Sequence, residues 1–228
     1  MKYIRLNITT EGQTEMEFAR KTLSTHFIKF GIIVDSRCVM TSKNKYKTYR
    51  GGLLDYGKAK KDILRWMAEE KSGEAYFTTM FDLYALPNDF PKFEESLKIQ
   101  DPYLRVSFLE EAFKKDIDNH KFIPYIQLHE FEALLLSNPE ILLIEYPDAR
   151  REIEKLKRII SENNNNPELV NTGKNTAPSK RIINLIPEYE GNKPTVGSIL
   201  AGIEGVEIQK NRCIHFGKWV EKIEKINS

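Results

Sequence analysis

The stretch YIRLNITTEGQTEMEFARKTL, residues 3–23, contains the change of hydrophobic period that decides the fold. Apolar and polar side chains alternate as far as Thr10, which is the pattern of a β-strand. Beyond Thr10 the apolar residues recur at helical spacing, at Met16, Ala19, Leu23, Phe27 and Phe30. Gly31 ends this pattern, as glycine commonly does at a helix C-terminus. The stretch therefore predicts a strand and then a helix, with Glu11 and Gly12 at the junction.

Strand and helix patterns go on alternating to about residue 137. GIIVDSRCVM (31–40) and EAYFTTMFDLYALP (74–87) are apolar and β-rich, and they predict the second and third strands. Between them a helix is expected, with an apolar face of Leu53, Tyr56, Ala59, Ile63 and Met67. After helical segments in residues 90–117, KFIPYIQLHEFEALLLS (121–137) predicts a fourth strand that runs into an amphipathic segment. This order predicts an α/β fold, with a parallel sheet and helices on both faces.

The C-terminal third is expected to be a helical extension packed on one side or edge of the sheet. Helices are predicted around residues 153–160, in TVGSILAGI (195–203) and in residues 212–226. Four consecutive asparagines, residues 163–166, favour a turn over a helix interior. We therefore expect an α/β domain at residues 1–146 and a helical extension at residues 147–228.

The composition is that of an ordinary globular protein. Thirty-five Lys and Arg nearly balance 33 Asp and Glu, so the formal net charge of +2 indicates no class of partner by itself. No signal-peptide pattern and no apolar run of about 18 residues occurs, and we expect a cytoplasmic protein without a membrane span. Cys38 and Cys213 lie far apart without a CxxC motif, so neither a zinc cluster nor a disulfide framework is expected.

Two acidic residues close predicted strands, Glu11 the first and Asp82 the third. The carboxyl ends of neighbouring parallel strands meet at one edge of a sheet, where such folds place their sites. Glu15 lies one helical turn beyond Glu11 and would share its face. Clustered carboxylates repel one another and require a cation, and oxygen ligands without sulfur select Mg²⁺ or Mn²⁺. The structural alternative is that acids near a helix start serve as caps and dipole partners.

The order of strand, Glu-Gly and helix, followed by a later strand that ends in Asp, resembles the Toprim fold. This fold is shared by topoisomerases, primases and the overcoming-lysogenisation-defect nucleases. In these nucleases a second acid follows the glutamate by four residues, as Glu15 follows Glu11 here. The resemblance covers roughly residues 1–137. It implies a metal-dependent nuclease in which Glu11, Glu15 and Asp82 hold Mg²⁺ or Mn²⁺, with Glu11 and Asp82 as catalytic residues.

A narrower likeness covers nearly the whole chain. The segments TEGQTE, FDLYALPNDFP, YIQLHEFEALLLS, NTAPSKRI and RCIHFGKWV resemble an uncharacterised bacterial Toprim-like family. Members of that family are often encoded beside an ABC-type ATPase and are associated with phage defence. The likeness implies an ATPase partner and a role as the effector of a defence system.

The chain departs from the Toprim pattern at one position. Toprim enzymes carry Asp-x-Asp at the end of the third strand, and Tyr84 stands where the second Asp is expected. A one-metal site and a non-catalytic derivative both stay open. Glu130 is the candidate to complete the metal shell, and His129 and Glu132 beside it are secondary candidates, with a role in the interior as the alternative. Glu130 and Glu132 face the same side if their segment is extended, and different sides if it is helical.

A basic group follows in NTAPSKRI. Ser179 is expected to cap a helix, so that a helix N-terminus coincides with Lys180 and Arg181, a combination suited to a phosphate. Lys180 is the candidate for stabilising transition-state charge, and a solvated basic face is the alternative. Arg212 and His215 are secondary candidates for the same site, with core packing as the commoner explanation of the histidine.

The segment KNKYKTYRGG, residues 43–52, is expected to be a polar loop. Cations for phosphates and rings for bases are what a single-stranded or distorted nucleic acid would need. The residues concerned are Lys43, Lys45, Tyr46, Lys47, Tyr49 and Arg50. A solvated surface loop explains the same composition.

The leading interpretation is a metal-dependent nuclease that cleaves DNA or RNA and is controlled by a partner ATPase. The first alternative is a catalytically inactive binding or regulatory subunit of an ATPase complex, because the second Asp is missing. The second alternative is a nucleotide hydrolase. The absence of GxxxxGK[ST] and GxGxxG motifs counts against this last class.

Overall fold

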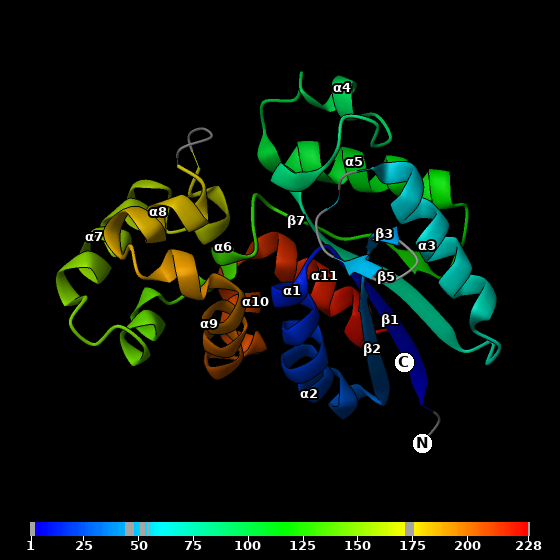
Figure 1. The fold of residues 1–228 in the computed structure, drawn as a ribbon, viewed down its shortest axis with the longest axis horizontal. Helices are drawn as coiled ribbons and strands as arrows, with labels where there is room; N and C mark the ends of the chain where they lie inside the picture. Colours follow the sequence, from blue (N-terminus) through cyan, green and yellow to red (C-terminus); the bar gives the residue numbers. More distant parts are fainter. Residues whose placement is uncertain (1–2, 44–47, 51–52, 54, 172–175, 228) are drawn as a thin grey trace. The chain divides into compact units, whose positions relative to one another are not determined.

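The computed structural model describes residues 3–43, 48–50, 53, 55–171 and 176–227 of the chain. It divides into two compact units, one of residues 1–126 with 224–228 and one of residues 127–223. The predicted boundary between residues 146 and 147 falls inside the second unit. The α/β class, the parallel sheet and the helical C-terminal part are confirmed (Figure 1).

The first unit is built on a five-stranded sheet of order β2-β1-β5-β6, with β7 also pairing with β5. Its strands are β1 (Ile4–Thr10), β2 (Ile32–Cys38), β5 (Ala75–Asp82), β6 (Phe122–Ile123) and β7 (Ile126–Gln127). The pairs β1–β2, β1–β5 and β5–β6 are parallel. Leu6 and Ile8 of β1 are fully buried, as expected for a central strand covered on both faces.

Helices flank this sheet, with α1 and α2 on one side of β1 and β2 and α3 and α5 on the other (Figure 1). Their bounds are α1 (Gln13–Phe18), α2 (Ser24–Phe27), α3 (Tyr56–Glu69), α4 (Phe93–Ser96) and α5 (Pro102–Ile117). A π-helical turn (Ala19–Leu23) joins α1 to α2, and 3-10 turns occupy Ile28–Phe30 and Leu83–Ala85. Gly31 ends the first helical succession with φ 71°, a left-handed conformation that favours glycine.

The predicted polar loop at residues 43–52 is corrected in part. β3 (Met40–Lys43) and β4 (Thr48–Arg50) form an antiparallel pair, in which Lys43 lies opposite Thr48. Thr and Tyr have high strand propensity, and this preference outweighs the charge of the segment.

The predicted fourth strand is divided into β6 and β7, which have two residues each. Pro124 stands between them and lacks the backbone donor that a continuous ladder needs. A side chain replaces the missing ladder bonds: Thr79 Oγ1 donates to Tyr125 O at 2.9 Å and accepts from Tyr125 N at 3.0 Å.

The second unit is helical. Its elements are α6 (Glu132–Leu135), a 3-10 segment (Pro139–Ile144), α7 (Arg150–Glu162), a 3-10 turn (Pro167–Leu169), α8 (Pro178–Leu185), α9 (Tyr189–Glu204), α10 (Val206–Arg212) and α11 (Ile214–Glu224, whose last residue belongs to the first unit). Leu134, Leu142, Leu156 and Ile182 are fully buried in its core. The asparagine run forms a turn as predicted, with φ 59° at Asn164. Among the described helices, none is long and apolar enough to cross a membrane.

The outer strand β2 is protected against pairing with a further strand. Gly31 O accepts from Ile4 N, and Val39 N donates to Thr10 O, so odd-numbered residues of this segment direct their backbone groups toward β1. The backbone groups of Ser36 therefore face the outer edge. There Ser36 N donates to Asp35 Oδ1 at 2.8 Å, and Ser36 O accepts from Arg20 Nη2 at 3.2 Å. Side chains thus occupy groups that an unprotected edge would offer to another chain.

Replacing Arg20 with alanine is expected to expose Ser36 O and to promote edge-to-edge association. We expect a loss of about 1 kcal/mol in the free energy of unfolding and a larger mass with rising concentration in light-scattering chromatography. Lys21→Ala, at an exposed lysine that pairs with Glu17, is the matched control. Equal masses for the Arg20 variant and the control at every concentration would show that this edge is protected by other means.

A buried carboxylate makes the stability of the second unit depend on pH. Glu204 is 8% exposed, and burial raises the pKa of this carboxyl to about 7. Ser137 Oγ donates to it at 2.6 Å and Gln209 Nε2 at 3.5 Å, and both bonds act in the opposite direction on this pKa. A carboxyl group whose pKa is higher in the folded protein favours folding below its ordinary pKa of 4.5. This contribution to the free energy of unfolding is lost as the pH rises through about 7.

Glu204→Gln is therefore expected to gain stability relative to the wild type between pH 4.5 and pH 7.5. The gain should reach about 3 kcal/mol, since one pKa unit corresponds to about 1.4 kcal/mol. Urea unfolding of both proteins at several pH values measures it. A difference between the two proteins that is the same at pH 5 and pH 8 would contradict the assignment.

Candidate functional site

Glu11 and Asp82 lie beside each other at the carboxyl ends of β1 and β5. The register pairs Thr10 with Met80, and Glu11 N donates to Met80 O at 3.2 Å. Glu11 Oε2 then accepts from Asp82 N, also at 3.2 Å. Both side chains are half-buried, and Asp82 Oδ1 is shielded from solvent. The two acids thus occupy the positions that strand order alone predicts for them.

The glycine of the Glu-Gly pair leaves room for the side chain of Glu15. Gly12 has φ −136°, an extended conformation that any residue adopts, so backbone strain does not demand glycine here. Glu15 is 8% exposed, and its Oε2 accepts from Gly12 N at 3.0 Å. A Cβ atom at residue 12 would lie 2.9 Å from this oxygen. Gly12 therefore leaves room for the Glu15 carboxylate, which caps the N-terminus of α1.

The donors of this group are of the type that a hard cation takes, although the carboxylate oxygens of Glu11, Glu15 and Asp82 do not all lie within 4.8 Å of one another. Carboxylate oxygens are the ligands that Mg²⁺ and Mn²⁺ prefer. Cys38, the nearest sulfur, donates its thiol proton to Gly12 O at 3.2 Å and so fixes the loop after β1. Tyr84 is 41% exposed, and its phenol does not replace the second Asp of the Toprim pattern.

Arg105 of α5, a neighbour of Tyr84, is a cation that the sequence did not single out. Burial lowers the pKa of its guanidinium, and the neighbouring Tyr84 acts in the opposite direction. Arg105 Nε donates to Ser96 Oγ at 3.3 Å. The sequence did not indicate a functional role for Arg105, because arginines on an amphipathic helix usually belong to its solvent-exposed face.

The second unit holds the sequence candidates from His129 to His215, and the predicted cap of α8 is corrected there. Ala177, not Ser179, is the N-cap residue of α8, because Pro178 with its fixed φ takes the first helical position. Ser179 N donates to Glu130 Oε2 at 3.0 Å. Lys180 and Arg181 lie in the first turn of a helix, as predicted. The anion at the N-terminus of this helix, however, is the carboxylate of Glu130.

Lys180 and Arg181 follow in the first turn of α8. Lys180 is exposed. Arg181 is half-buried, and its Nε is shielded with no hydrogen-bond partner among the described residues.

His129 and Glu132 are both buried. His129 has φ 66°, and its Nδ1 lies 3.3 Å from Asn171 Nδ2. The bend at Leu128 and His129 ends the extended segment, so Glu130 lies outside β7 and Glu132 begins α6.

Two residues of α9 that the sequence did not indicate hold Glu132. Tyr189 Oη donates to Glu132 Oε1 at 3.1 Å, and Lys193 Nζ lies 3.2 Å from the same oxygen. Glu132 is 0% exposed, and burial raises the pKa of its carboxyl while the charge of Lys193 opposes this effect. No periodicity indicates such contacts between residues far apart in the chain.

Arg212 and His215 are not brought to Glu130 by any described contact. Arg212 is exposed at the end of α10. His215 is buried, and its backbone N donates to Glu168 Oε2 at 2.8 Å. Glu168 Oε1 accepts from Phe216 N at 3.0 Å, so this fully buried glutamate caps α11.

The sequence candidates therefore form two groups, one in each unit, and each group is described by itself. Of the basic segment, Lys45, Tyr46 and Lys47 lie outside the described residues. Lys43 belongs to β3, and Tyr49 and Arg50 belong to β4.

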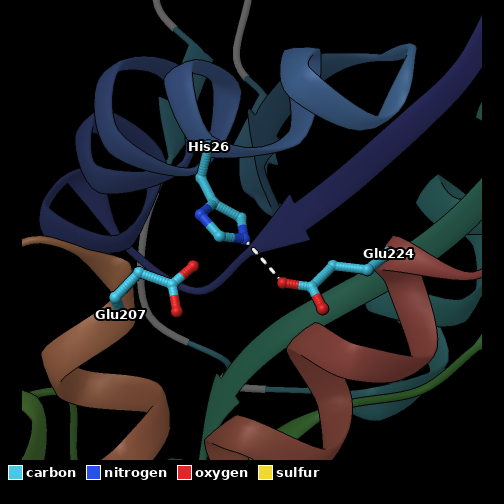
Figure 2. A group of neighbouring side chains, drawn as sticks. All are labelled: His26, Glu207 and Glu224. Atoms are coloured by element: carbon cyan, nitrogen blue, oxygen red, sulfur yellow. Dashed lines mark hydrogen bonds and ion pairs between the residues drawn. The ribbon is translucent and has the colours of Figure 1, made fainter.

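A further polar contact of the first unit joins its two chain segments. His26 Nε2 lies 2.8 Å from Glu224 Oε1, as Figure 2 shows. Nearby, Asn227 Nδ2 donates to Phe30 O at 3.0 Å. These contacts attach residues 224–227 to the helical segment after β1.

Comparison with known proteins gives a family but no activity. No curated protein sequence and no solved structure matches the chain. A family model described as a domain of unknown function, DUF4276, matches residues 10–224, which is nearly the full length. The chain therefore belongs to the DUF4276 family.

Proposed function

We propose that the protein is a Toprim-like nuclease that depends on Mg²⁺ or Mn²⁺ and hydrolyses nucleic-acid phosphodiesters. The observation that carries the proposal is the contact between Glu11 and Asp82. Their carboxylates come from adjacent parallel strands, and the amide of Asp82 fixes Glu11 through a 3.2 Å hydrogen bond. Ligating carboxylates are commonly oriented by hydrogen bonds of this kind.

In this proposal the residues divide the work as follows. Glu11 and Asp82 hold the ion, which would supply an activated water and stabilise the leaving oxygen. Glu15 orients a second ion or a water. The roles expected for Glu130 in completing the shell and for Lys180 in stabilising the negative charge of the transition state concern residues of the second unit, and they rest on the sequence alone. The nucleic acid is contacted by Lys180 and by a larger basic set: Lys43, Lys45, Tyr46, Lys47, Tyr49, Arg50 and Arg181.

The biological setting is proposed from family likeness. An ABC-type ATPase would control the nuclease, and the nuclease would act as the effector of a phage-defence system.

A second candidate function is a non-catalytic subunit of the same ATPase complex. Two observations favour it. Glu15 Oε2 is engaged by Gly12 N, and Tyr84 occupies the place of the second Asp. In that case the fold would serve binding alone.

Glu11→Gln and Asp82→Asn are each expected to abolish Mn²⁺ binding and cleavage, because each removes an anionic ligand while keeping the side-chain shape. Calorimetric titration of Mn²⁺, followed by cleavage assays on single-stranded and duplex DNA and RNA, measures both effects. We expect cleavage to fall by at least about a hundredfold, or roughly 2.7 kcal/mol of activation free energy.

Matched controls exist on the same unit. Glu17→Gln lies on α1 at a glutamate paired with Lys21, and Asp118→Asn lies at a φ of 51°, which asparagine tolerates. Both should bind Mn²⁺ as the wild type does. Unchanged binding in folded Glu11→Gln and Asp82→Asn would refute the proposed site, and absent binding in the wild type would favour the non-catalytic subunit.

Lys180→Gln is expected to weaken nucleic-acid binding in the presence of a chelator. The loss should be several-fold at about 0.1 M salt, and the slope of log K against log salt should fall by about one, as for one lost phosphate contact. Fluorescence anisotropy measures both quantities. Lys155→Gln, on the exposed face of α7, is the control. An equal loss in the two variants would indicate a general charge effect and no phosphate contact at Lys180.

A further inference from the structure

The first turn of α9 is anchored in the second unit by the fully buried side chain of Tyr189 and by the contacts that Tyr189 and Lys193 make with the buried carboxylate of Glu132. Tyr189 and Lys193 are four residues apart and so lie on the same face of the helix. Both contact Glu132 Oε1, at 3.1 and 3.2 Å. Between these two residues, Glu190, Gly191 and Asn192 are exposed.

This turn is a weak helix by itself. Gly191 costs about 1 kcal/mol relative to alanine in a helix interior. Pro194 lacks the N–H that would bond the carbonyl four residues earlier, so the turn is joined to the rest of α9 by fewer hydrogen bonds. The stability of the turn must therefore come from its contacts.

The following part of α9 is anchored independently. Leu200 is 2% exposed and Ala201 is fully buried. Gln209 Nε2 donates to Ala201 O at 2.8 Å, which ties this part to α10. α9 therefore consists of a firmly packed second half and a first turn whose described polar contacts converge on Glu132, with the Tyr189 ring buried beside them.

The burial of Glu132 strengthens its contacts with Tyr189 and Lys193, and it also makes the buried carboxylate depend on these two partners. The side chain is 0% exposed, and its Oε2 is shielded without a hydrogen-bond partner among the described residues. A buried carboxylate is retained only where partners compensate for its lost hydration. Lys193 supplies the positive charge and Tyr189 a hydrogen bond, while the neighbouring Glu130 repels it.

We propose that residues 189–195 form a strap that opens while the rest of α9 stays folded, and that Tyr189 and Lys193 lock it by holding Glu132. Opening removes both covering side chains from Glu132. The strap thus controls the access of water and small cations to the carboxylate of Glu132. This inference does not depend on nuclease activity.

Hydrogen exchange of the full chain, followed by mass spectrometry on peptides covering residues 186–206, tests the strap. Tyr189→Phe removes one hydroxyl, and Lys193→Met removes the charge with little change of length. Each is expected to accelerate exchange at residues 190–196 about ten- to a hundredfold, as for a lost hydrogen bond to a buried charged group. Exchange at residues 198–204 should be unchanged.

A variant that is expected to slow hydrogen exchange, instead of accelerating it, strengthens the test. A Cβ atom at Gly191 meets nothing within 4 Å, so Gly191→Ala should slow the exchange of residues 190–196 about fivefold through helix propensity alone. Lys155→Met, on α7, should change nothing in α9.

Two results would overturn the proposal. One is wild-type exchange at residues 190–196 in both Tyr189→Phe and Lys193→Met, which would leave the lock without effect. The other is an acceleration that extends equally over residues 198–204, α7 and α8, which would mean that the second unit opens as a whole. A local acceleration in the two variants with slowing in Gly191→Ala supports the strap.

Discussion

The parallel pairing of β1 with β5 is the constraint on which the candidate site depends. In this register Thr10 lies beside Met80, so the chain leaves both strands at the same height, and Glu11 Oε2 meets the amide of Asp82. A shift of one residue would exchange the face on which Leu6 and Ile8 are fully buried with the face on which Asn7 and Thr9 are buried, and this mismatch disfavours other registers. The packing of the apolar core therefore fixes the positions of Glu11 and Asp82, although neither residue belongs to that core.

Much of the first unit follows from hydrophobic period, because its strands are apolar and its helices have one buried face. The change of period at Thr10 and the acid at the end of β5 were enough to predict the position of Glu11 and Asp82. The hydrophobic period does not indicate where a strand is interrupted or where a charged segment forms a strand. Pro124 divides a predicted strand in two, and β3 and β4 pair in a segment whose charges resemble those of a loop.

The second unit was less predictable because its polar contacts join residues that are distant in sequence. Glu132 is held from α9, more than fifty residues away, and Glu168 caps α11 across a similar separation. Ser179 illustrates a smaller error of the same kind. Its residue type suggested an N-cap, but Pro178 takes the first helical position, so that Ala177 is the N-cap residue. The backbone N of Ser179 instead donates to the carboxylate of Glu130. Buried glutamates thus stabilise this unit, and each depends on partners that only the fold supplies.

The most direct test is a crystal structure of the protein soaked in Mn²⁺, with anomalous scattering recorded at the manganese edge. If Glu11 and Asp82 form the metal centre, an anomalous peak will lie roughly 2.1 Å from a carboxylate oxygen of each. The same crystals of Asp82→Asn will lack this peak. A manganese peak at other residues, with both carboxylates outside coordination distance, would contradict the assignment of the site.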